Sequence, residues 1–60
     1  MAEDKTSIQE MAKLIASIRN DASRLKEISH GIQAVDRNVD RILSSVKMLE
    51  INVSDLLDVL

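Results

Sequence analysis

Aliphatic side chains recur along the chain at alternating intervals of three and four residues. A seven-residue repeat of this kind, kept over many turns, is typical of a left-handed coiled coil, whereas a half-buried strand would alternate with period two. The pattern therefore predicts an all-α chain with one continuous apolar seam. The predicted core positions are Met11, Leu14, Ile18, Leu25, Ile28, Ile32, Val35, Val39, Ile42, Val46, Leu49, Val53, Leu56 and Leu60.

The start of the predicted helix is marked by a capping box. The Ser7 side chain can accept a hydrogen bond from the backbone N–H of Glu10, whose own side chain reaches back. We therefore expect residues 1–6 to be a flexible N-terminus and residues 7–60 to form the coiled-coil oligomerisation helix.

Gly31 is the one residue in that range that clearly disfavours a helix, at a cost of about 1 kcal/mol. A turn at residues 29–31 would fold the chain into a hairpin, and this is the alternative arrangement. We favour a single long helix, because the apolar repeat keeps its phase on both sides of Gly31.

A chain of 60 residues without cysteine has few ways to become stable on its own, and oligomerisation is the one left open by its composition. β-Branched residues occupy both kinds of core position, which shifts the preference from dimers toward trimers or tetramers. We expect a parallel homotrimer, with a tetramer or a dimer as the alternatives. The expected partner is thus the chain itself.

Two groups of residues carry further expectations. Asp21 is the one polar residue at a core position, so it is a candidate determinant of specificity, either solvated or paired with Arg24. Apolar residues outside the seam are candidate contacts for a further coiled-coil protein. These are Leu43, Met48, Ile51 and Leu57.

Composition narrows the possible functions. The net charge of −2 and the absence of Phe, Tyr and Trp argue against nucleic-acid binding, and no apolar run is long enough for a membrane span. A single histidine, His30, and no cysteine offer neither a metal site nor a nucleophile with its base. We therefore expect no enzyme, no cofactor and no metal, and a cytoplasmic or nuclear location.

Two stretches resemble the heat shock factor binding protein family. The segment LEINVSDLL contains a Leu-Glu pair, Asn52 and the Asp55-Leu56 pair, and SIQEMAKLI contains Ile8 followed by Gln and an acidic residue. The family's central aromatic residue has no counterpart here. The resemblance implies a short trimeric coiled coil in the cytosol or nucleus that acts as a negative regulator of heat shock transcription factor.

The sequence thus predicts a non-enzymatic coiled-coil module for oligomerisation and protein interaction. Two alternatives remain open at this stage. The chain could be the oligomerisation segment of a larger protein, such as a viral phosphoprotein, or a subunit of a hetero-oligomeric helical complex in vesicle trafficking.

Overall fold

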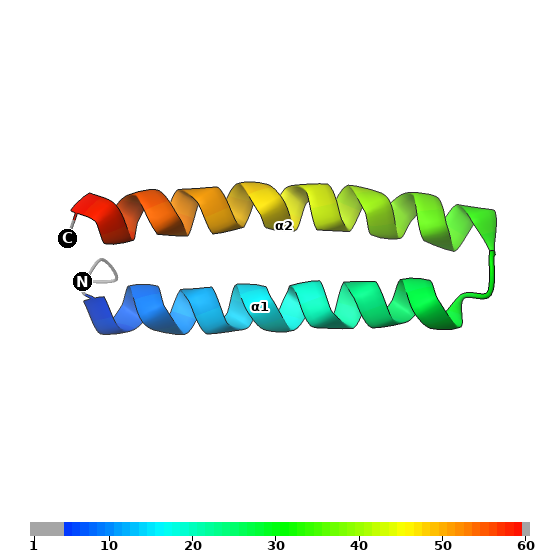
Figure 1. Cartoon of the computed structure of the whole chain (residues 1–60), viewed down its shortest axis with the longest axis horizontal. Helices are drawn as coiled ribbons and strands as arrows, with labels where there is room; N and C mark the ends of the chain where they lie inside the picture. Colours follow the sequence, from blue (N-terminus) through cyan, green and yellow to red (C-terminus); the bar gives the residue numbers. More distant parts are fainter. Residues whose placement is uncertain (1–4, 60) are drawn as a thin grey trace.

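The computed structural model describes residues 5–59 as two antiparallel α-helices joined by a short turn (Figure 1). Helix α1 spans Lys5–Ile28 and helix α2 spans Gln33–Val59. The molecule measures 42 × 15 × 14 Å, so it is about as wide as one pair of packed helices. The prediction of an all-α chain is confirmed.

The prediction of one continuous helix is wrong, because the chain reverses direction between Ile28 and Gln33. His30 and Gly31 both adopt positive φ angles, of 55° and 84°, and this left-handed conformation ends α1. The Ile32 carbonyl then accepts the 2.9 Å hydrogen bond from the Asp36 backbone N–H that opens α2. Gly31 is therefore a turn residue and not a weak point inside a rod.

A buried hydroxyl fixes the geometry of this turn. The Ser29 Oγ lies 3.0 Å from the Lys26 carbonyl oxygen and 2.5 Å from the Asp36 carboxylate, both of which are acceptors. Ser29 thus connects the end of α1 to the first turn of α2. The opposite charges of Lys26 and Asp36 also suit the partial charges of the helix ends that they occupy.

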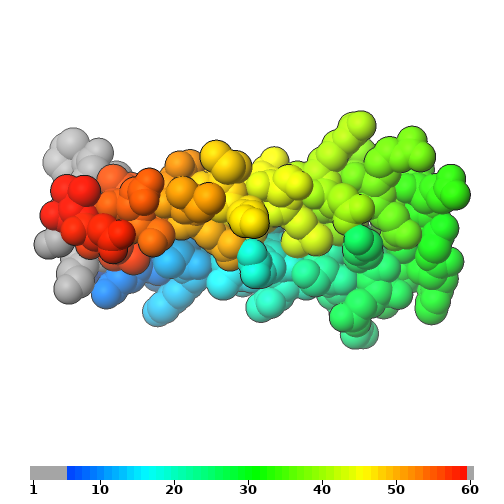
Figure 2. Space-filling model, turned by 45° about the horizontal axis from the view of Figure 1, so that its top comes forward, coloured from blue at the N-terminus to red at the C-terminus, as the bar shows by residue number. Residues whose placement is uncertain are grey.

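The two helices pack through one row of side chains from each. Ile8, Ile15 and Ala22 of α1 and Val39, Val46 and Val53 of α2 are buried, and each row repeats every seven residues. Figure 2 shows the helices in contact along their length. We call these two rows the hairpin seam. Ile8, Ile15 and Ala22 are not among the predicted core positions, although their own seven-residue spacing is visible in the sequence.

The N-terminal boundary also differs from the prediction. Helix α1 begins at Lys5, so Thr6, which was expected in the flexible segment, is helical and Ser7 lies in the first turn of the helix. Residues 1–4 of the predicted flexible segment, and the predicted core residue Leu60, lie outside the described residues.

Candidate interaction surface

Most residues predicted to form an oligomer core lie on one exposed side of the hairpin. Ile18 and Leu25 of α1 line a shallow hollow together with Ile42 of α2, so both helices contribute to this side. The other predicted core residues on this side lie at intervals of three, four, seven or fourteen residues from these three, which places them on the same faces of the two helices. We define the apolar face as Met11, Leu14, Ile18, Leu25 and Ile28 of α1 with Val35, Ile42, Leu49 and Leu56 of α2.

The apolar face is only partly covered by the hairpin itself. Five side chains near the seam keep between 40% and 44% of their surface exposed, and they are Ile18, Leu25, Ile42, Leu49 and Leu56. Met11 and Val35, at the ends of the same rows, are more covered, and Met11 packs against the seam. Farther from the seam, Leu14 and Ile28 are exposed at 58% and 53%. The near-uniform exposure of the inner residues means that both helices present a half-covered apolar row over most of their length.

Charged groups are almost absent from the apolar face. Among the described residues, Asp21 is the one charged side chain that interrupts the rows of the face, midway between Leu14 and Ile28, and it lines the same hollow as Ile18 and Ile42. The row next to the face on α2 carries the neutral residues Asn38, Ser45 and Asn52. A partner that covers this face therefore meets little charge to desolvate, apart from one carboxylate in each chain.

Arg24 forms its ion pair with Glu27 and not with Asp21, the partner considered in the sequence analysis. Arg24 lies 3.6 Å from Glu27, one turn further along α1, and both side chains are largely exposed. Asp21 is itself exposed in the hairpin. Its carboxylate is therefore solvated while the apolar face is uncovered.

The other side of the seam carries charge pairs between the helices. The Arg19 Nη2 atom lies 2.6 Å from Glu50 Oε1, and the Lys26 Nζ atom lies 2.5 Å from Asp40 Oδ1. The hydrogen bond and the negative charge of Asp40 raise the pKa of Lys26 above its usual value. Because these groups are substantially exposed, the pairs orient the two helices more than they stabilise them.

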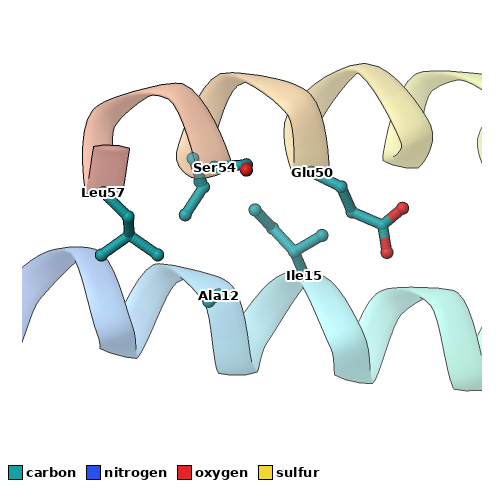
Figure 3. Close-up of a pocket in the computed structure, with 6 residues that line it drawn as sticks. Ala12, Ile15, Glu50, Ser54 and Leu57 are labelled. Atoms are coloured by element: carbon teal, nitrogen blue, oxygen red, sulfur yellow. The ribbon is translucent and has the colours of Figure 1, made fainter. Parts of the chain in front are cut away.

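A second hollow lies on this charged side, toward the open end of the hairpin (Figure 3). Ala12 and Ile15 of α1 form one wall, and Ser54 and Leu57 of α2 form the other, with Glu50 at its edge. This hollow is open and lacks convergent polar groups. It resembles a gap between packed helices more than a ligand site.

The four residues predicted as contacts for a further protein do not form one patch. Leu43 is half-buried and Leu57 lines the hollow beside Glu50. Met48 is 58% exposed, and Ile51 borders a polar depression with Lys47 and Asp55. They are spread around α2, so the structure does not bring them together.

The predicted core residues fall into three groups in the hairpin. Val39, Val46 and Val53 are buried inside the chain. The members of the apolar face are exposed or half-buried, and Ile32 in the turn is 57% exposed. Whether the exposed ones form the core of an oligomer stays a prediction.

Within residues 5–59, no group of His, Cys, Asp or Glu is arranged to hold a metal ion. Neither of the two helices has the length and hydropathy needed to cross a bilayer. The apolar face is therefore the most distinctive feature of the part of the chain that the structure describes.

Comparison with known proteins gives no relative: no protein-family model, no curated protein and no solved structure matches this chain.

Proposed function

We propose that this chain is a non-enzymatic helical assembly module whose apolar face is covered by helices of another polypeptide. The observation that carries the proposal is the row of inner side chains on that face, which stay 40–44% exposed on both helices. Contiguous apolar surface of this kind marks protein interaction sites, and heptad spacing suits a helical partner.

The small core of the hairpin supports the same proposal. The seam consists of six apolar side chains, of which one is an alanine. Chains of about this length bury too little surface to be comfortably stable alone, and oligomerisation is one of the usual remedies. A hairpin of this size therefore needs additional burial, and the apolar face offers the surface for it.

The partner class follows from the face. It is long, apolar and nearly uncharged, which fits the apolar sides of amphipathic helices and not an anionic or basic ligand. Self-association, and association with another coiled-coil protein, are both compatible with it. The role in heat shock regulation that the sequence resemblance implies rests on a rod-shaped trimer, so it stays a prediction and adds nothing to this proposal.

Site-specific photo-crosslinking in the native cell tests the proposal. A photoreactive amino acid replaces Leu49 on the apolar face in one variant and Ile51 in the matched control. The two residues lie on the same helix and have similar exposures, of 41% and 46%. We expect adducts with a helical segment of a second polypeptide from position 49 only. Equal labelling from both positions, or none from either, would contradict the proposal.

A further inference from the structure

We infer that the partner on the apolar face is a second copy of this chain, packed face to face in a two-fold symmetric four-helix bundle. The inference rests on the proposed function and names the occupant of its surface. Four observations carry it: the rows that each helix presents, the length of the face, its lack of charge and the surface that the hairpin leaves exposed.

Each helix presents the two adjacent apolar rows that a four-helix bundle requires. In α1 the buried row contains Ile15 and the half-exposed row contains Ile18; in α2 the corresponding residues are Val46 and Leu49. A helix in a four-helix bundle contacts two neighbours, so one row packs within the hairpin and the next row packs across the bundle. In the hairpin the first row is buried against the other helix, whereas the second row stays half-exposed.

The length of the face also points to a second hairpin. Half-exposed residues extend from Ile18 and Leu25 on α1 to Leu56 near the end of α2. A single helix laid between α1 and α2 would cover the inner residues but leave Leu14 and Ile28 at its margins, because these point more directly away from the seam. A second hairpin is two helices wide and, being an identical chain, has the same length.

The exposed area agrees with one interface of ordinary size. The chain has an accessible surface of 4722 Å². A compact monomer of 6.7 kDa is expected to expose about 3,900 Å². The chain thus exposes about 800 Å² more than a compact monomer of its mass, which is of the same order as the area that each partner buries in a standard protein interface.

The near absence of charge makes the face compatible with itself. Two copies related by a two-fold axis bring identical surfaces together, so a strongly charged face would repel its own copy. The charged pairs Arg19–Glu50 and Lys26–Asp40 lie on the other side of the seam and stay in solvent. Asp21 is then the one carboxylate that the interface must accommodate.

Sedimentation equilibrium combined with small-angle scattering tests the inference on the full chain. We expect twice the chain mass at micromolar to near-millimolar concentrations, with a longest dimension close to the 42 Å of the hairpin. A monomer, or a trimer or larger assembly, would overturn the inference. So would a dimer about 80 Å long, the length of a continuous helix of this chain.

Two matched variants show which surface forms the dimer. Leu49→Asp places a charge on the apolar face, and Ile51→Asp places the same charge on the polar side of the same helix. We expect Leu49→Asp to raise the dimer dissociation constant at least about 100-fold and Ile51→Asp to change it less than about threefold. An unchanged dissociation constant in Leu49→Asp would place the interface elsewhere.

The outcomes separate this inference from the proposed function. Because Leu49 is 41% exposed in the hairpin, the variant can keep its fold, and circular dichroism checks the helicity of the resulting monomer. If the wild-type chain is monomeric but position 49 cross-links to a different protein, the second-copy inference fails and the proposed function stands. If the chain is monomeric and position 49 gives no adduct, both fail.

Discussion

The direction of the chain is decided at two backbone positions. His30 and Gly31 adopt φ angles of 55° and 84°, a region that glycine enters freely and other residues enter at a cost of about 1–2 kcal/mol. A methyl group added at Gly31 would meet nothing within 4 Å, so its effect would come from the backbone alone. The turn therefore stores strain at His30 and avoids it at Gly31.

Gly31→Ala should lower the melting temperature of the chain, because alanine resists the left-handed conformation of the turn. A loss of about 1 kcal/mol corresponds to about 4–8 °C in a domain of this size. His30→Gly should raise the melting temperature by relieving the same strain. Thermal unfolding followed by circular dichroism measures both, and a stabilising Gly31→Ala would favour a continuous helix, in which alanine is preferred to glycine.

Asp21→Leu should strengthen self-association. In the hairpin Asp21 is exposed, but covering the apolar face would take its carboxylate out of water, which is costly for an unpaired charge. We expect the dimer dissociation constant to fall at least about tenfold with leucine, which adds apolar burial of about 1.5–3 kcal/mol. Asp21→Asn, which removes only the charge, should give an intermediate value. Weaker association of Asp21→Leu by sedimentation equilibrium would show that the carboxylate makes a needed contact.

At the scale of the helices, α1 carries two adjacent apolar rows, either of which has the spacing needed to pack against α2. The row of Ile8, Ile15 and Ala22 packs in the hairpin, while the neighbouring row of Met11 and Ile18 belongs to the apolar face. Both rows repeat every seven residues, so periodicity alone cannot decide which one faces α2. The seam of α2, in contrast, uses residues that the repeat had assigned to core positions.

Ile15→Ala should lower the free energy of unfolding by about 2–4 kcal/mol, because it opens a cavity in the hairpin seam. Ile51→Ala, on the exposed side of α2, should change it by less than about 0.5 kcal/mol. Urea unfolding of both variants at one chain concentration gives the comparison. Similar small effects would indicate that Ile15 lies outside the core and would contradict the hairpin seam.

The all-α fold and the buried positions Val39, Val46 and Val53 could be predicted from the sequence, since helical periodicity depends only on local spacing. The turn could not, because the repeat passes through Gly31 in phase and one glycine costs little in a helix. What decides the fold is the contact of Ile8 and Ile15 with Val46 and Val53, which are far apart in sequence. The residues of the apolar face were among the predicted core positions. Which core positions pack inside the hairpin and which stay exposed could be told only from the antiparallel packing of the two helices.

At the scale of the whole molecule, the two sides of the hairpin differ in character. One side of its seam carries the Arg19–Glu50 and Lys26–Asp40 pairs, and the other carries the uncovered apolar face. A monomer would keep that face in water, whereas pairing two copies would bury it without adding any new element to the chain. Self-association, expected from the sequence, thus stays a proposal, but the proposed assembly is a dimer of hairpins and not a parallel trimer of continuous helices.

The most direct test is the distance between the open ends of the two helices, since the apolar face and the proposed four-helix bundle both require the hairpin. Spin labels at Gln9 and Asp58, measured by double electron–electron resonance in chains diluted with unlabelled protein, report that distance within one chain. Neighbouring helices lie about 8–10 Å apart, so a hairpin predicts a label separation of about 10–25 Å. A continuous helix would separate the two positions by about 74 Å, and a distance of that size would contradict the account.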